Sequence, residues 1–278
     1  MKMNDWMVKE IIKRALVEDL GNGDITTRNL IAETQEGQGL FLAKASGIVA
    51  GLEVSAAVFS CLEPAARFTA FNHDGDEIKP GDRIARVEGK MSTLLSGERV
   101  ALNFLQRLSG IASKTRNMVG SIKYQHAVLV DTRKTTPGLR LLEKYAVRVG
   151  GAKNHRFGLY DGVMIKDNHI QAVGGIQKAV STLRQKVPHT LKIEVEVENL
   201  QQLQEALEAR ADIILLDNMD SESMRKAVEI VNGQALLEAS GGVNEENIVE
   251  IAKTGVDFIS CGALTHSAPS LDISFKIL

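Results

Sequence analysis

The chain has 278 residues, of which 44% are hydrophobic and 24% are charged, and its formal net charge is -2 at pH 7. This length allows one large domain or a large and a small one, and the weakly acidic charge argues against a general nucleic-acid-binding surface. The two cysteines, Cys61 and Cys261, are far apart in the sequence, which argues against a disulfide scaffold or a zinc site. No run approaches the ~20 apolar residues of a membrane span, and charges interrupt the N-terminal stretch throughout, unlike a signal peptide. We therefore expect a cytoplasmic protein.

The first part of the chain predicts a helix followed by short strands. Residues 5–19 have the spacing of an amphipathic helix, whose apolar side is made of Trp6, Ile11, Ala15 and Leu16. From Gly39 to Gly89, short β-like runs alternate with turn residues. Residues 74–89 predict a hairpin that turns at residues 79–82, and we interpret this region as scaffold.

A long helix is predicted next, at about residues 97–118. Its apolar residues recur at spacings of four, three and four, at Ala101, Leu105, Leu108 and Ala112. Ser96 is the expected N-cap, because its hydroxyl can accept a hydrogen bond from a free N–H of the first turn. We expect this helix to connect two domains.

The rest of the chain alternates short β-branched runs with helical segments. The runs are residues 127–131, 162–166, 192–196, 212–217, 235–239 and 256–260. Repeated units of a strand and a helix predict a parallel sheet with helices on its outside. Their number favours an α/β barrel over a small open sheet.

Polar or small residues follow each predicted strand of this part. They are Arg133, Lys166, Glu196, Asp217, Ser240 and Gly262. The carboxyl ends of barrel strands surround a common opening, where such enzymes keep their active sites. We therefore expect these residues to converge in space, in an enzyme that binds anions.

Residues 131–169 carry a local excess of positive charge. Eight Lys or Arg residues stand there against four Asp or Glu, although the whole chain is net acidic. Such an excess suits a multiply charged anionic substrate. For the cations on the predicted helix, at positions 140, 144 and 148, we favour an interpretation as surface charges or ion-pair partners. For those at strand or loop ends we favour a role in binding, and these are Arg133, Lys134, Arg156 and Lys166.

Carboxylates and glycines complete the predicted site. Glu194 and Glu196 face one side of a strand, where unpaired acids would be costly, and Asp217 ends an apolar run. Glu196 is nearer the opening, while Glu194 is equally compatible with a supporting and a structural role. The sequences ASGGV and SCGAL end the last two strands, where barrel enzymes commonly bind a phosphate group.

Eight blocks of sequence resemble the quinolinate phosphoribosyltransferase family, in the family's order and over nearly the whole chain. They are GNGDITT, SGERVALNFLQRLSGIAS, DTRKTTPGLRLLEKYAV, GGAKNHRFGLYDGVMIKDNHI, EVEVENL, LLDNM, EASGGV and SCGALTHS. The resemblance implies an α/β fold, with an N-terminal open α/β sandwich plus an incomplete TIM-like α/β barrel. The implied domains are residues 1–110 and 111–267, with the tail 268–278 returning to the first. Ala152 departs from the family, which tends to have a glycine there, but the charged residues are intact.

The resemblance also implies the reaction. It is phosphoribosyl transfer from phosphoribosyl pyrophosphate to quinolinate with decarboxylation, which gives nicotinate mononucleotide, pyrophosphate and CO₂ in de novo NAD synthesis. One alternative is a related pyridine phosphoribosyltransferase that takes nicotinate, but a single carboxylate would not need so many cations. A second is a non-catalytic anion-binding accessory protein of the same fold, which would not require Glu196 and Asp217 beside the phosphates.

The family's site residues map onto this sequence one by one. The resemblance assigns catalysis to Lys134, Lys166, Glu196 and Asp217. It assigns substrate binding to Arg99 from the neighbouring subunit, Arg133, Lys134, His155, Arg156, Lys166, Glu196, Asp217, Ser240, Gly241 and Gly262. It implies Mg²⁺ near Glu196 and Asp217, held largely through substrate phosphates. It also implies a homodimer, or a larger assembly of dimers, with shared active sites, and neither a nucleic acid nor a membrane as partner.

Overall fold

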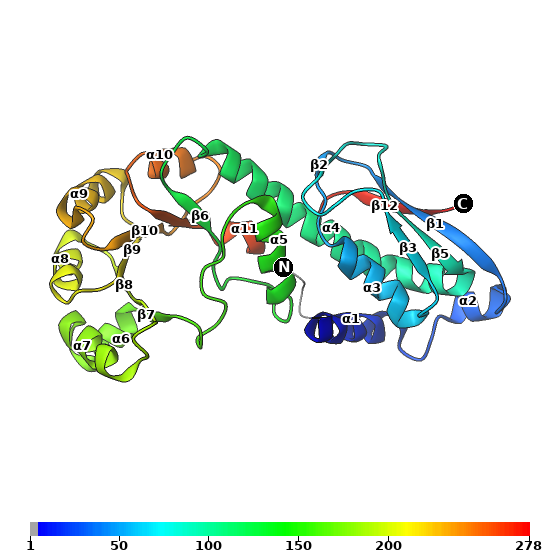
Figure 1. The fold of residues 1–278 in the computed structure, drawn as a ribbon, viewed down its shortest axis with the longest axis horizontal. Helices are drawn as coiled ribbons and strands as arrows, with labels where there is room; N and C mark the ends of the chain where they lie inside the picture. Colours follow the sequence, from blue (N-terminus) through cyan, green and yellow to red (C-terminus); the bar gives the residue numbers. More distant parts are fainter. Residues whose placement is uncertain (1–4) are drawn as a thin grey trace. The chain divides into compact units, whose positions relative to one another are not determined.

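The structure is a computed structural model that describes residues 5–278. The chain forms two compact units, shown in Figure 1. Unit 1 is Met1–Arg116, Thr136–Gly151 and Ser267–Leu278, and unit 2 is Asn117–Thr135 and Ala152–His266. The domain boundary expected at residues 110 and 111 stays a prediction.

Unit 1 contains a four-stranded antiparallel sheet. Its strand order is β12-β1-β5-β3, with bounds Ile273–Ile277, Glu36–Ala43, Arg83–Lys90 and Arg67–Ala70. One face carries an aromatic core in which Phe41 lies 4.8 Å from Phe275 and 6.2 Å from Phe59, measured between ring centroids. β12 therefore lies at an edge of this sheet and pairs with β1, although the two strands are far apart in the sequence.

The helices of unit 1 are α1 (Asp5–Leu20), α2 (Ile25–Leu30), α3 (Leu52–Leu62), α4 (Met91–Ser121, which continues into unit 2) and α5 (Arg140–Gly150). The predicted apolar stripe of α4 is confirmed, since all four of its residues are buried. The apolar side expected for α1 is partly wrong. Trp6 is 65% exposed, and the buried positions are Val8, Ile12 and Leu16, which recur every four residues.

Two further local expectations are wrong, and a third is narrowed to one of its two interpretations. Ser96 is not an N-cap, because α4 begins at Met91 and the Ser96 hydroxyl donates instead to Asp24 Oδ2 at 3.2 Å. The turn at residues 79–82 forms, but the strands beside it do not pair with each other. β4 (Glu77–Ile78) pairs with β2 (Gly47–Ile48), whereas β5 pairs with β1 and β3. Of the two interpretations for the cation at position 144, that of a surface charge is wrong, because Lys144 is 1% exposed on a side of α5 that packs into the interior, and that of an ion-pair partner stays a prediction.

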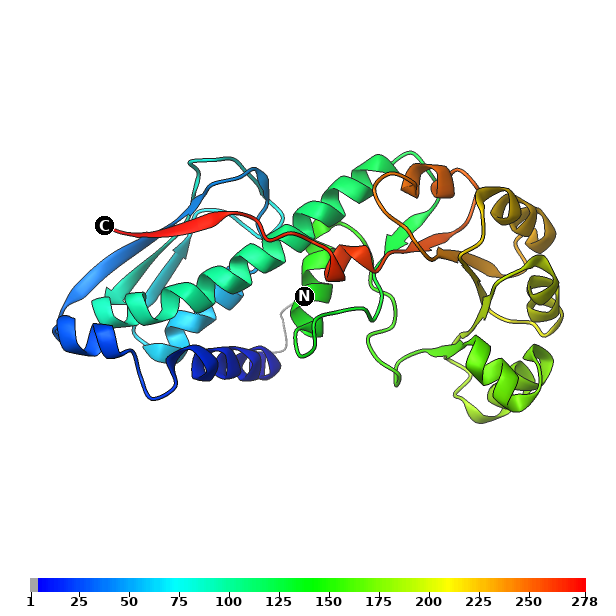
Figure 2. The same ribbon diagram turned by 180° about the vertical axis from the view of Figure 1, so that it is seen from behind.

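Unit 2 contains a six-stranded parallel sheet. Its order is β6-β11-β10-β9-β8-β7, with bounds Val128–Val130, Phe258–Ser260, Leu236–Ser240, Ile213–Asp217, Ile193–Val197 and Val163–Ile165. Figure 2 shows the sheet from behind, curved like part of a barrel wall. Since β6 and β7 are the two ends of the order, the barrel is incomplete, and the predicted α/β fold class is confirmed.

The helices of unit 2 are α6 (Asp167–Val173), α7 (Ile176–Lys186), α8 (Leu200–Glu208), α9 (Ser221–Val231), α10 (Ile248–Ala252) and α11 (Ala263–His266). Figure 1 shows α7 to α10 on the outer side of the curved sheet. Because the strands are parallel, their carboxyl ends lie at the same edge of the sheet, which positions the site. No helix within residues 5–278 is long and apolar enough to cross a membrane.

Candidate active site

A cavity of about 570 Å³ lies at the carboxyl ends of the strands of unit 2. It brings together all six residues predicted from the strand ends. Among its lining residues are Arg133, Lys134, His155, Arg156, Lys166, Glu196, Asp217, Ser240, Gly241 and Gly262. The predicted convergence is confirmed as geometry, whereas the chemical role of each residue stays a prediction.

Arg133 and Lys134 lie in the turn that follows β6. The Lys134 amide donates to Thr132 Oγ1 at 3.0 Å, and the Lys134 carbonyl accepts from Thr265 Oγ1 at 2.7 Å. The backbone of Lys134 is thus held on both sides. Within the described residues its Nζ has no hydrogen-bond or ion-pair partner, so the cation is available to a ligand.

Arg156 is a half-buried cation beside Arg133. Its Nη1 donates to the Gly162 carbonyl oxygen at 3.0 Å, which orients the guanidinium. Burial, and then the positive charge of Arg133, lower the pKa of Arg156 below its usual value. Two guanidinium groups that repel each other in one cavity are a ready site for an anion, which would relieve that repulsion.

Lys166, Glu196 and Asp217 line the same cavity. Lys166 Nζ forms an ion pair with Glu196 Oε2, and the Lys166 amide donates to His169 Nδ1 at 3.0 Å at the start of α6. Asp217 Oδ2 accepts from the Asn218 side chain at 2.9 Å. Each carboxylate therefore keeps one oxygen to which no described residue donates, and such oxygens are the ligands that Mg²⁺ prefers.

Two loops without bulky side chains complete the cavity, after β10 and β11. Gly241 and Gly242 have φ of 93° and 61°, a region that favours glycine. A Cβ on Gly241 would lie 2.9 Å from the Asn218 backbone nitrogen, and one on Gly262 would lie 2.9 Å from Lys134 Cδ. Glycine thus lets both loops approach their neighbours closely, and loops of this kind commonly bind phosphate through backbone N–H groups.

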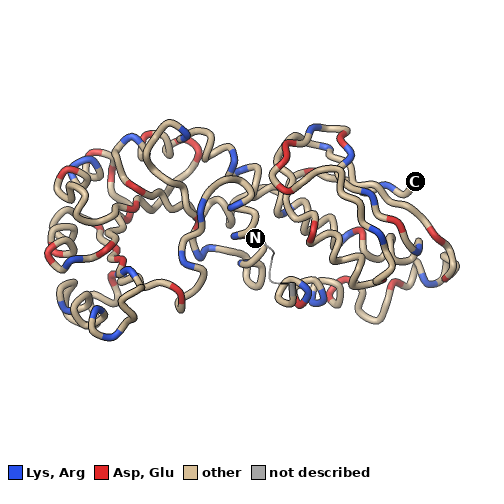
Figure 3. Tube along the Cα trace, viewed as in Figure 1, with Lys and Arg blue, Asp and Glu red and all other residues tan. Residues whose placement is uncertain are grey.

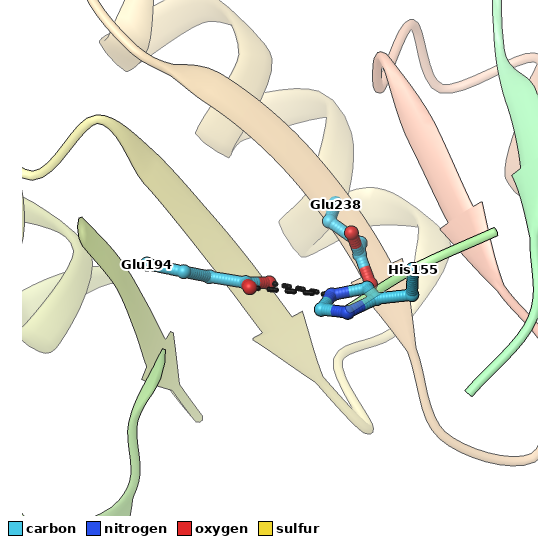
Figure 4. Close-up of side chains that lie close together, drawn as sticks. All are labelled: His155, Glu194 and Glu238. Atoms are coloured by element: carbon cyan, nitrogen blue, oxygen red, sulfur yellow. Dashed lines mark hydrogen bonds and ion pairs between the residues drawn. The ribbon is translucent and has the colours of Figure 1, made fainter. Parts of the chain in front are cut away.

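His155, Glu194 and Glu238 form a largely buried cluster at the wall of the cavity, shown in Figure 4. His155 Nε2 is 3.2 Å from Glu194 Oε2 and 3.5 Å from Glu238 Oε1. Burial, and then the charge of Glu194, raise the pKa of Glu238 to about 7. The sequence analysis missed Glu238, although a carboxylate inside an apolar strand next to a glycine loop is itself a signal.

Asp131 is a second residue that sequence reasoning missed. It is fully buried, and it accepts from the Asn154 side chain at 2.6 Å and from the His155 amide at 2.8 Å. It therefore fixes the start of the loop that carries His155 and Arg156. Its position at the end of β6, directly before the expected site, could have suggested this role.

Arg99 is the one predicted site residue outside this cavity. It lies on α4 in unit 1, is exposed, and is not among the residues that line the cavity.

Figure 3 shows Lys and Arg interspersed with Asp and Glu along the trace of each unit. The cationic character of the cavity thus comes from convergence of a few side chains, because the two signs are mixed elsewhere.

The parallel sheet curves into part of a barrel, and cations, carboxylates and glycine loops lie at the carboxyl ends of its strands. Together these features define an α/β-barrel enzyme that binds anions. Two family models match the chain. The quinolinate phosphoribosyl transferase N-terminal domain matches residues 24–109, and the C-terminal domain of the same enzyme matches residues 111–276. The chain belongs to the quinolinate phosphoribosyltransferase family.

Known relatives resemble the chain over almost its full length. A probable nicotinate-nucleotide pyrophosphorylase (carboxylating) of Synechocystis is 47% identical over 270 residues, which cover 96% of this chain and 91% of the relative. One of Bacillus subtilis is 46% identical over 275 residues, covering 99% and 95%. The solved structure of the nicotinate-nucleotide pyrophosphorylase from Francisella tularensis aligns with a TM-score of 0.95 at 39% identity, covering 100% of this chain and 98% of that one.

Proposed function

We propose that the chain transfers the phosphoribosyl group of phosphoribosyl pyrophosphate to quinolinate and releases CO₂, in de novo NAD synthesis. The observation that carries this proposal is the composition of one cavity. It combines four cations, the carboxylates of two strand ends and two glycine loops, namely Arg133, Lys134, Arg156, Lys166, Glu196, Asp217, Gly241 and Gly262. The names of the relatives support the same reaction.

Substrate binding follows from the charges. Quinolinate carries two carboxylates, and the guanidinium pair of Arg133 and Arg156 can grip them at two points each. Lys134 and Lys166 are compact charges suited to the pyrophosphate. The 5′-phosphate fits the loops after β10 and β11, where Ser240 adds a hydroxyl donor.

The chemistry begins at the anomeric carbon of the ribose. The bond from this carbon to pyrophosphate breaks, positive charge develops on the ribose, and the ring nitrogen of quinolinate forms the new C–N bond. The carboxylates of Glu196 and Asp217 face this region and stabilise the developing charge. The pyridine ring is then cationic, so it accepts the electron pair of the adjacent C–C bond as the 2-carboxylate leaves as CO₂. A proton takes its place on the ring, and the product is nicotinate mononucleotide.

The free oxygens of Glu196 and Asp217 fit a Mg²⁺ ion, and these two residues would hold it. Mg²⁺ held there would supply positive charge to offset that of the pyrophosphate leaving group. Lys166 supports this arrangement, because its ion pair with Glu196 keeps that carboxylate at the edge of the cavity.

We also propose that the enzyme is a homodimer in which Arg99 completes the partner's site, either alone or within a larger assembly of dimers. Arg99 stands in the third turn of α4, exposed and outside the cavity of its own chain. A cytoplasmic location is part of the same proposal. Both cysteines are free thiols, which suits a reducing compartment.

Release of labelled CO₂ from carboxyl-labelled quinolinate tests the function. The release should depend on phosphoribosyl pyrophosphate and should match the amount of nicotinate mononucleotide formed. Nicotinate, which lacks the second carboxylate, serves as the comparison substrate and should be used poorly. Binding of both substrates without release of CO₂ would instead favour an anion-binding accessory protein.

A further inference from the structure

The cluster of His155, Glu194 and Glu238 places three ionisable groups where water hardly reaches. Glu194 and Glu238 are each 4% exposed, and the His155 side chain is 14% exposed. Glu194 comes from β8 and Glu238 from β10, and Figure 4 shows both carboxyl groups directed at the ring of His155. His155 and Glu238 also line the cavity, so the charge of this cluster acts directly on any bound anion.

The hydrogen bonds of His155 define its tautomer. The backbone amide of Arg156 donates to His155 Nδ1 at 2.7 Å, so this nitrogen acts as an acceptor and carries no proton. The single proton of the neutral ring is therefore on Nε2, which faces Glu194 and Glu238. An imidazolium would place a second N–H against the Arg156 amide. The geometry thus favours a neutral ring.

A neutral ring cannot balance two buried carboxylates, so one of them must carry a proton. Glu194 is attracted to Arg156, which offsets its charge. Burial, and then the charge of Glu194, raise the pKa of Glu238, and they outweigh His155 and the Ser260 hydroxyl, which lower it. Its register partners on the neighbouring strands are the apolar Leu215 and Phe258. Glu238 Oε1 is buried and has no hydrogen-bond partner. Glu238 is therefore the member of the pair that holds the proton.

We propose that Glu238 is a positioning and affinity-setting residue whose neutral carboxyl group lies under the dicarboxylate, and whose ionisation weakens binding of that substrate. This inference rests on the proposed function. In the neutral form Glu238 leaves the tautomer of His155 and the loop to Arg156 undisturbed. In the ionised form it adds a second buried negative charge next to the carboxylates of quinolinate, and like charges in a buried site repel strongly.

The sign of the pH dependence follows from the raised pKa of Glu238, about 7. Below this pH the group is neutral and the substrate binds well. As the pH rises through it, the group ionises, and the KM for quinolinate should rise about threefold or more between about pH 6 and about pH 8.5, with a smaller change in kcat. Since quinolinate is already a dianion in this range, the substrate itself contributes no such rise.

The decisive variant is Glu238→Gln, which keeps the shape of the side chain and makes it permanently neutral. Its KM for quinolinate should be flat over the same pH range and should be lower than that of the parent enzyme at high pH. A gain in affinity is an outcome that simple loss of structure does not produce. Glu250→Gln, the same change on the exposed side of α10, is the matched control and should keep the parent pH profile. If Glu238→Gln keeps the parent rise in KM, or binds more weakly at high pH, the proposal is wrong.

A second measurement does not depend on turnover. Infrared spectroscopy should find the carbonyl stretch of a protonated carboxyl group at about pH 6, lost both in Glu238→Gln and at high pH. Nitrogen NMR of the His155 ring should report a proton on Nε2. If quinolinate is not turned over at all, the proposed function fails, while these spectra still decide where the proton lies. A band that survives in Glu238→Gln would overturn the assignment.

Discussion

Arg133 and Lys166 direct their charges into the cavity and contribute little to the core. Both are partly exposed, and both follow short strands whose packing is provided by their apolar residues. The apolar side chains of these strands therefore provide the packing, whereas the two cations after them are available for function. Removal of either cation should therefore affect chemistry much more than stability.

We expect Arg133→Ala and Lys166→Ala each to lower kcat/KM by about a hundredfold or more, because each removes a charge that interacts with the anionic substrates. Steady-state assays measure the loss, and thermal unfolding should stay close to that of the parent chain. Near-normal turnover in either purified variant would refute the assignment of that residue.

Glu196→Gln and Asp217→Asn should impair catalysis more than binding. Both carboxylates are placed to stabilise charge that develops only as the bond to pyrophosphate breaks, so their loss should appear in kcat. Calorimetry of quinolinate binding is the companion measurement, and the affinity should change little. The assigned roles are wrong if loss of affinity for quinolinate accounts for the whole effect.

Part of the site was predictable from the sequence at this scale, and part was not. Strand ends are visible as β-branched runs followed by a polar residue, so the four cations, Glu196 and Asp217 could be found. Glu238 was missed, because its place in an apolar strand next to a glycine loop marks it only as unusual, and its importance depends on Glu194 and His155, which are 44 and 83 positions away and meet it only in the folded barrel. Burial and proximity are properties of the fold, and sequence spacing does not reveal them.

At the scale of elements, α4 and α5 are tied together beside the turn that carries Lys134. Arg107 of α4 donates to Glu143 Oε1 at 2.9 Å, and Thr136 donates to the same carboxylate through its amide at 3.0 Å and its hydroxyl at 2.7 Å. Glu143 is completely buried. This carboxylate therefore anchors the chain two residues after Lys134.

We expect Glu143→Ala to destabilise the protein by about 3 kcal/mol, because it leaves a largely buried guanidinium and two backbone or hydroxyl donors without their acceptor. Denaturant unfolding measures this loss. Glu222→Ala, which breaks the exposed Lys226–Glu222 pair on α9, is the control and should leave the midpoint unchanged. Equal effects of the two substitutions would contradict the anchoring role.

Sequence patterns predicted local turns and helices better than the pairing of strands or the hydrogen-bond partners of side chains. The turn at residues 79–82 was recognised from its residues, yet β4 and β5 pair with strands elsewhere in the chain. A turn is a local event, while strand pairing depends on what else is near in space. The start of α4 was missed for a related reason, since Ser96 found a distant partner in Asp24 and the helix extends past it.

At the scale of the whole molecule, the exposed Arg99 leads to a test of subunit sharing. We expect Arg99→Ala and Lys166→Ala to be inactive alone and to regain activity when mixed under conditions of subunit exchange. Half of the dimers should be mixed, and each mixed dimer has one intact site, so about a quarter of the parent activity should return. Mass spectrometry confirms the exchange. If exchange occurs without any recovery, Arg99 acts within its own chain or has no role.

The pairing of β12 with β1 has a consequence for how the protein is made. Residues 273–277 align with residues 39–43, so an edge of the first sheet stays open until the ribosome has translated β12, which follows unit 2 in the sequence. During that time the backbone groups of β1 on this side are unpaired, and such an edge can recruit strands from other nascent chains. Unit 2 lies between the two partners in the sequence and can form its sheet first. β12 thus completes the first sheet late in vectorial folding, and a ribosome that stalls before β12 would release a chain prone to aggregation.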